Sequence, residues 1–275
     1  MAMNLKPFIK QIVPNPALDL IYSIYNRGSE PCSLKSLVVL PSSISDFFVW
    51  HPYIAKTEFI AENTRALLLG SREKVTHCFK FFSEKGDFLC EEKHTSDDFF
   101  SRIILSGPQN SSSYSSFIHY VEAKNSLYDL VKEKFHINNF VCEQNKGYCI
   151  YYPNLSSSVG SSIHGNFVSI SRNGKLLART KTLHLYSPAY RFESQNIYDL
   201  VFNNPTPSEV KIRILFNNDS EKNKTLQINS LGTESLRLDA YSGSLTFESR
   251  LPICRPVLFK NVTKGKSENF DVLHS

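Results

Sequence analysis

The chain has 275 residues, of which 41% are hydrophobic and 21% charged, and its formal net charge is +5. This composition is typical of a globular protein, and the length suits one large domain or two ordinary ones. Lys and Arg are interleaved with Asp and Glu, so we expect no nucleic-acid partner, because phosphate binding needs clustered cations. No apolar run approaches the roughly 20 residues needed to cross a bilayer, and the N-terminus lacks the apolar core of a signal peptide. We therefore expect no membrane partner.

Short strands with alternating apolar residues dominate the predicted elements. The chain contains 20 Phe and 13 Tyr against 2 Met and 1 Trp, and aromatic side chains favour half-buried sheet surfaces. In chain order, the first clear strand covers residues 18–25 and a second follows at 34–40. A short helical turn is possible around residues 45–49. Further strands are predicted at 66–69, 75–82, 102–105, 116–121, 148–152, 166–170, 175–180, 198–202, 210–216, 226–229, 235–238, 245–249 and 257–260.

Turn residues separate these strands. Asn173-Gly174 lies between two alternating runs and predicts a two-residue hairpin turn, because both residues tolerate positive φ. One helix is predicted at 127–135, where Ser126 can cap the start and lysines suit the end. Short strands at this spacing are typical of sandwiches and barrels rather than of βαβ units.

The two ends of the chain resemble each other. Residues 21–31 and 198–207 each read as an apolar strand that breaks at an Asn-led turn and leads into a second strand. We therefore expect an all-β fold of two tandem antiparallel β-sandwiches, immunoglobulin-like or jelly-roll-like, at residues 1–124 and 137–275. A short helix or linker at 125–136 would join them. The alternative is a single interleaved sandwich in which the two similar ends pair with each other.

The six cysteines are widely spaced and form no Cys-x-x-Cys pair, so neither a zinc knuckle nor a thioredoxin-type site is indicated. We expect most of them to be reduced in a cytoplasmic protein, and we expect no cofactor. Cys142 and Cys149 flank a polar turn and could form a hairpin disulfide, which the sequence leaves open. Cys78 follows His77 in a predicted strand, so the two side chains should point to opposite faces.

One Ser-rich loop, at 154–162, leads into a tripeptide with the composition of a binding site. A Gly permits close approach of a ligand, while His and Asn supply donors and acceptors. Two tyrosines precede the loop, and a cation lies one hairpin away. The predicted ligand-binding residues are His164, Gly165, Asn166, Tyr151, Tyr152 and Arg172. The alternative is that the tripeptide is only a tight turn at the start of a strand.

Several histidines follow an apolar residue near the end of a predicted strand. The candidate metal ligands are His119, His164, His184 and His274. A catalytic site would need three such ligands and an open position. The alternative, which we favour, is a half-buried histidine bonded to a neighbouring carbonyl group.

No motif for nucleotide, acyl, phosphoryl or redox chemistry is present, and the carboxylate pairs Glu91-Glu92 and Asp97-Asp98 suggest solvated turns. We therefore expect a non-catalytic binding or scaffolding protein. Carbohydrate is the preferred ligand, because exposed aromatic rings can stack on sugars. The proposed platform is Tyr151, Tyr152, Tyr186, Tyr190 and Trp50. The alternatives are a His-based metal-dependent enzyme and a protein–protein adaptor that uses an exposed sheet edge. The sequence leaves the oligomeric state open.

Overall fold

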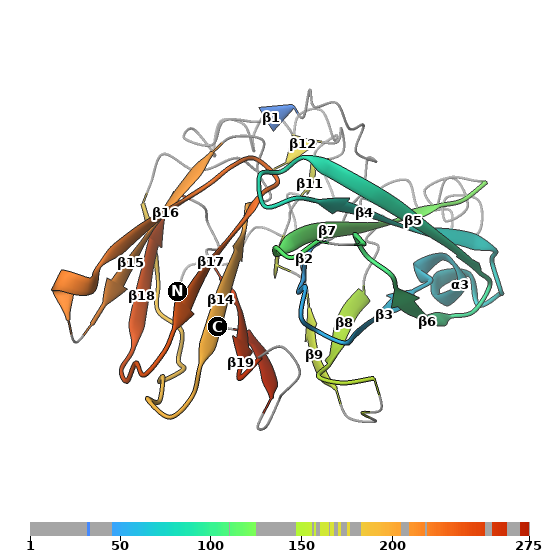
Figure 1. The fold of residues 1–275 in the computed structure, drawn as a ribbon. Helices are drawn as coiled ribbons and strands as arrows, with labels where there is room; N and C mark the ends of the chain where they lie inside the picture. The colour runs from blue at the N-terminus through green and yellow to red at the C-terminus, as the bar shows by residue number, and fades with distance from the viewer. Residues whose placement is uncertain are drawn as a thin grey trace, which may run out of the picture.

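Strands make up nearly all of the regular structure. The computed structural model describes residues 32–33, 46–109, 111–124, 147–155, 157, 160–164, 166–167, 170–171, 175–176, 183–204, 209–217, 219–250, 255–262 and 270–274. These residues contain one short α-helix, α3 (Thr64–Leu69), and one 3-10 turn, η1 (Ser220–Lys222). The all-β prediction is therefore confirmed (Figure 1). In the described part of the chain, no helix has the length and apolar character that a membrane span requires.

Two antiparallel sheets are built from the earlier strands. The first has the order β10 (Asn166–Phe167), β2 (Asp46–Trp50), β7 (Ser115–Glu122), β4 (Val75–Phe82) and β5 (Phe88–Ser96). The second has the order β6 (Phe100–Leu105), β3 (Lys56–Glu62), β8 (Gly147–Tyr152) and β9 (Ser161–His164). Their strands alternate along the chain, so neither sheet comes from one continuous segment.

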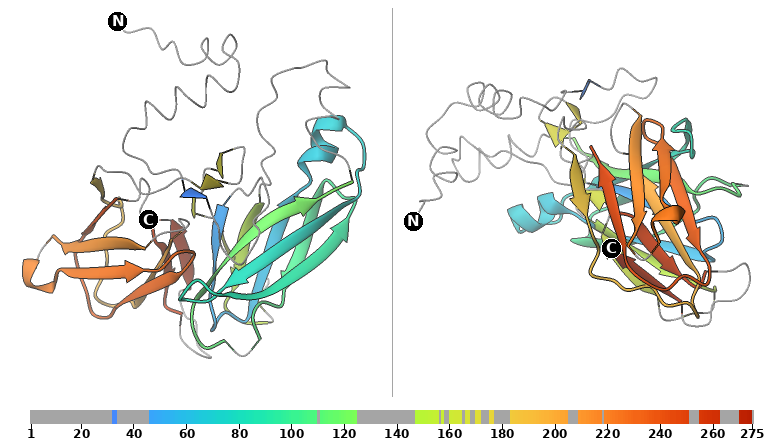
Figure 2. Two further views of the ribbon diagram at one scale, coloured as in Figure 1. Left: turned by 90° about the horizontal axis from the view of Figure 1, so that it is seen from above. Right: turned by 90° about the vertical axis from the view of Figure 1, so that its left-hand side faces the viewer.

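Two further sheets come from the C-terminal part, which Figure 2 shows in orange and red on the opposite side from β2 to β7. The third sheet has the order β13 (His184–Tyr186), β18 (Leu245–Ser249), β15 (Val210–Phe216) and β16 (Lys224–Ile228). The fourth has the order β17 (Thr233–Leu238), β14 (Tyr198–Asn203), β19 (Val257–Lys260) and β20 (Asp271–His274). A small fifth sheet joins β1 (Cys32–Ser33), β12 (Lys175–Leu176) and β11 (Ile170–Ser171).

The alternation of apolar and polar residues explains most of these strands. In β15, Val210, Ile212 and Ile214 are buried, whereas Lys211 and Arg213 are exposed, as predicted. The predicted hairpin after Ile170 also forms, because β11 pairs with β12. Its register pairs Ser171 with Lys175, which leaves three intervening residues rather than the predicted two.

Two local predictions are wrong. Residues 45–49 fall largely in β2 and not in a helical turn, because Phe47, Phe48 and Val49 all enter buried positions. Residues 66–69 fall in α3 and not in a strand. Asn63 caps this helix by accepting a hydrogen bond from the backbone of Ala66, and Gly70 ends it at φ 66°. The predicted helix at 127–135 and the early strands at 18–25 and 34–40 lie outside the described residues, as does the pairing of the two similar ends.

The fourth sheet packs on both of its faces. Leu200 and Phe202 of β14 lie in a core shared with the third sheet. Val201, which points the other way, lies with Val257 and Phe259 in a second core shared with the first two sheets. In the part of the chain that the structure describes, the third sheet therefore packs on one face of the fourth, and the first two sheets pack on its other face.

This packing corrects the expected arrangement. The four large sheets are read as the small blades of a four-bladed β-propeller and not as two tandem sandwiches. The sandwich prediction failed because it assumed that each sheet buries one face, whereas the fourth sheet buries two. Moreover, β8 pairs with β3 and β10 pairs with β2, although both follow residue 137. The interleaved order also differs from a simple propeller, in which each blade is one continuous segment.

Two turns dock against each other where the first and fourth sheets meet. The backbone N–H of Thr233 donates to the carbonyl of Glu84 at 3.0 Å, and Ser116 Oγ donates to the carbonyl of Leu231 at 2.8 Å. Gly86 has φ +89°, and a Cβ atom there would lie 1.8 Å from the carbonyl oxygen of Ser230. The β4–β5 turn therefore fits its neighbour only because residue 86 has no side chain.

We expect Gly86→Ala to lower the free energy of unfolding by at least about 2 kcal/mol more than Gly70→Ala. Both glycines have positive φ, but an added Cβ at Gly70 meets nothing within 4 Å. The matched pair therefore separates the backbone clash from the cost of left-handed φ. Chemical denaturation of the two variants and the wild type measures the difference, and equal losses would contradict the docking of the turns.

Candidate functional site

Tyr151, a predicted ligand-binding residue, belongs to the core. Its side chain is fully buried, its Oη donates to the carbonyl of Val49 at 2.6 Å, and its ring meets Phe259 edge-on at 5.2 Å. Burial raises the pKa of this phenol well above its usual value. The ring therefore cannot serve in a surface platform for sugars.

Tyr152 lies on the opposite face of β8, within a group of charges. Its Oη donates to the carboxylate of Glu58 at 2.9 Å, and Lys56 Nζ lies 3.7 Å from the ring centroid. Arg102 donates to the same carboxylate, and this hydrogen bond is the main reason that the pKa of Glu58 is lowered. Although Tyr152 is only 5% exposed, it is held by polar contacts and not by a hydrophobic core.

The predicted tripeptide marks a crossing between sheets. His164 of β9 pairs with Tyr148 in the second sheet, whereas Asn166 of β10 pairs with Phe47 in the first. The chain therefore passes from the second sheet to the first between these two residues. Gly165, Arg172 and the side chains of His164 and Asn166 lie outside the described residues, so their role in binding stays a prediction.

The candidate metal ligands are distributed over four strands. His119 belongs to β7 in the first sheet, His164 to β9, His184 to β13 and His274 to β20. The side chain of His274 lies outside the described part. Among the side chains that the structure describes, no group of three potential metal ligands includes a histidine.

His119 forms a buried ring pair instead. Its Nε2 lies 3.0 Å from Nδ1 of His77, and both side chains have no exposed surface. One ring nitrogen must donate and the other accept, so the pair cannot carry two protons at these atoms. As the alternation predicts, His77 points inward and Cys78 points to the outer face of β4, where Glu91 and Glu122 lie. His119 is therefore a core residue whose ring is hydrogen-bonded to another histidine.

A second buried histidine connects the first and fourth sheets, and the sequence did not single it out. His51 Nδ1 accepts from the backbone N–H of Tyr53 at 3.2 Å, so the ring hydrogen is on Nε2, which lies 3.4 Å from Tyr114 Oη. The phenol of Tyr114 in turn interacts with Asp199 of β14, which pairs with Arg237 of β17. Burial is the main reason that the pKa of Asp199 is raised. These contacts give the buried polar side chains between the first and fourth sheets hydrogen-bond or ion-pair partners.

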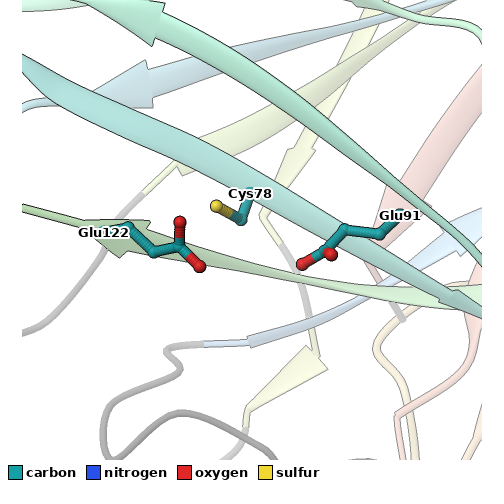
Figure 3. A group of neighbouring side chains, drawn as sticks. All are labelled: Cys78, Glu91 and Glu122. Atoms are coloured by element: carbon teal, nitrogen blue, oxygen red, sulfur yellow. The ribbon is translucent and has the colours of Figure 1, made fainter.

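Three donor atoms converge on the outer face of the first sheet (Figure 3). The thiol of Cys78 and the carboxylates of Glu91 and Glu122 lie within 4.8 Å of one another. The sequence placed Glu91 in a solvated loop, but it lies on β5 and shares a face with Cys78. The strand period of two, once applied to residues 88–96, is the signal that could have found this group.

An exposed apolar surface lies at α3 and β6. We call it the α3–β6 patch; it consists of Leu67 (43% exposed), Leu68 (38%), Phe99 (36%), Phe100 (54%) and Ile104 (61%). The backbone N–H of Asn63 donates to the carbonyl of Phe99 at 2.9 Å, which holds the start of α3 beside β6. Exposed groups of large apolar side chains on a folded chain mark interaction surfaces.

The buried histidines predict a loss of stability in mild acid. Burial lowers the pKa of His51 from 6.5 to about 3 and that of His77 to about 4. Because each folded-state pKa lies below the unfolded-state value, the neutral rings stabilise the fold fully above pH 6.5. The contribution disappears as the pH falls toward the folded-state pKa. Between neutral pH and pH ~4.5, we expect each ring to lower the free energy of unfolding by about 2 kcal/mol.

Urea unfolding at a series of pH values measures this effect. His77→Gln and His51→Gln should each flatten the acid limb of the stability curve, because the replaced ring no longer titrates. His184→Gln, on the edge strand β13, is the matched control and should keep the wild-type slope. Parallel curves for all three variants would show that the buried rings do not cause the acid sensitivity.

Comparisons with known proteins give no functional assignment. No protein-family model matches the chain, and no curated protein matches it. Any function must therefore be inferred from the geometry described above.

Proposed function

We propose that the chain is a non-catalytic binding protein that holds a protein partner on the α3–β6 patch. The observation that carries this proposal is the exposure of two phenylalanines and three aliphatic side chains on α3, on β6 and at Phe99, which directly precedes β6. Phe100 and Ile104 point outward from β6, where the exposed and buried residues alternate strictly. Burying such a surface against a partner would release its ordered water and stabilise the complex.

The position of β6 supports a strand-based mode of binding. Among the described strands, β6 pairs only with β3, so it is an edge of the second sheet. Edge strands offer backbone donors and acceptors to an incoming extended segment. Side chains on such a segment would lie beside Phe100, Arg102 and Ile104. This agrees with the adaptor alternative, in which a protein partner adds to a sheet edge.

The adaptor role is preferred to carbohydrate binding on the basis of burial. Two of the five aromatic residues expected to stack on sugars, Tyr151 and Tyr152, are buried. Trp50 is partly buried and meets Phe81 edge-on at 5.7 Å. Carbohydrate binding, centred on His164 and Asn166, is retained as the second proposal. A cytoplasmic location is also proposed, since Cys78, Cys90 and Cys149 are all free thiols.

Site-specific photo-crosslinking tests the adaptor role. A photoreactive phenylalanine analogue at position 100, in the full chain expressed in its native cells, should give one discrete protein adduct. The control is the same analogue at Leu185, which is 67% exposed on β13 of the third sheet. The double variant Phe100→Ser, Ile104→Ser should remove a crosslink formed from Leu68, because the partner loses its apolar contact.

Absence of an adduct at position 100, or an identical adduct at Leu185, would contradict the proposal. An adduct that forms equally in purified protein would identify a second copy of the chain as the partner. A glycan array measures the other candidate: saturable sugar binding that survives Phe100→Ser but is lost in His164→Ala would favour carbohydrate.

A further inference from the structure

We propose that Cys78, Glu91 and Glu122 form a binding site for a thiophilic divalent cation of the zinc class. The three residues lie on three adjacent strands of the first sheet, β4, β5 and β7, and their donor atoms lie within 4.8 Å of one another. Figure 3 shows the sulfur of Cys78 between the two carboxylates. The site is on a different sheet from the α3–β6 patch and does not depend on the adaptor proposal.

The register explains why these side chains meet. Cys78 pairs with Lys93 on β5 and with Tyr120 on β7. Glu91 and Glu122 each lie two positions from those partners, so they share the face of Cys78 and flank it diagonally. Rigid strands thus carry all three donors, and the geometry does not rest on a loop.

The donor set selects one class of metal. A thiolate with two carboxylate oxygens matches the borderline-soft preference of Zn²⁺ and leaves a fourth tetrahedral position for water. Mg²⁺ and Ca²⁺ require six or more oxygen ligands and do not match this set. Bond lengths of about 2.3 Å to sulfur and about 2.1 Å to oxygen place tetrahedral donors about 3.5 Å apart. The two exposed glutamates can close that remaining distance by rotating about their side-chain bonds.

Two ammonium groups now lie where the cation would compete: Lys80 Nζ is 3.9 Å from a carboxylate oxygen of Glu91, and Lys93 pairs with Glu122. Lys93 Nζ contacts both carboxylate oxygens of Glu122 at 3.0 Å, and this pair lowers the pKa of Glu122. The Lys93 side chain is 46% exposed, so the pair is a surface salt bridge that a metal ion can displace at small cost. Tyr120 Oη donates to Glu91 and would keep that carboxylate oriented, as an outer partner of a metal ligand does.

The thiol supplies the specificity. Cys78 has no exposed surface, and burial raises its pKa to about 11, with a further contribution from Glu122. Without metal the sulfur therefore carries its proton at neutral pH. Metal binding forms the sulfur–metal bond and releases this proton to solvent. The thiolate is a soft ligand, and a site made of the two carboxylates alone would not provide one.

Titration of the purified full chain with Cd²⁺, in a non-thiol reductant, tests the site. We expect a cadmium–thiolate charge-transfer band that saturates at one equivalent and disappears in Cys78→Ser. The matched control is Cys90→Ser, because Cys90 precedes Glu91 on β5 but packs against the first core on the opposite face. This control should keep the band.

The carboxylates and the lysine give independent readouts. Glu91→Gln and Glu122→Gln should each weaken Cd²⁺ binding by about tenfold or more while the band remains. Lys93→Met should tighten binding by about fivefold, because one of the two competing ammonium groups is removed. A missing band at excess metal, a band that survives Cys78→Ser, or glutamate variants that bind like the wild type would each overturn the proposal.

Discussion

The structure depends on the fourth sheet, which is buried on both faces. Every residue of β14 is buried, from Tyr198 to Asn203. Alternate side chains enter the core with the third sheet and the core with the first two. A sheet of this kind cannot leave one core without exposing its apolar surface to water, at roughly 25 cal/mol for each Å². The two halves of the chain are therefore coupled through the fourth sheet.

The polar groups near this sheet follow from the same constraint. A strand buried on two sides must satisfy any charge it carries, and Asp199 does so through Arg237 and the phenol of Tyr114. His51 extends these contacts to the first sheet. The turns that contain Gly86 and Ser230 also join the first and fourth sheets, through close contact between their backbone atoms. Contacts between sheets thus combine apolar packing with a few well-defined polar bonds.

The two proposed sites share a physical origin in the strand alternation of the earlier sheets. On β6 the outward positions are apolar at Phe100 and Ile104, which suits a macromolecular partner. On β4 and β5 the outward positions are polar, and they bring the thiol of Cys78 beside Glu91. The same period of two therefore produces a hydrophobic surface at one sheet and a cluster of ligand atoms at the other.

Alternation and turn residues determined much of the local structure. The strands at Val75–Phe82 and Val210–Phe216, the pairing across Asn173-Gly174 and the opposite directions of His77 and Cys78 all follow from residue period. Helix α3 was missed because its six residues, Thr64 to Leu69, are too few to show a helical period. The capping by Asn63 was the better signal.

Sheet partners and burial were decided only by the tertiary structure. Nothing in Tyr151-Tyr152 distinguishes a core ring from one held by charges, because exposure depends on strands that are distant in sequence. The pairing of β8 with β3, across some 90 residues, likewise has no local signal. The sequence by itself therefore determined an all-β protein and the direction of many side chains. The order of the sheets, and with it the convergence of Cys78, Glu91 and Glu122, came from long-range packing, because a strand's own residues do not specify its neighbour.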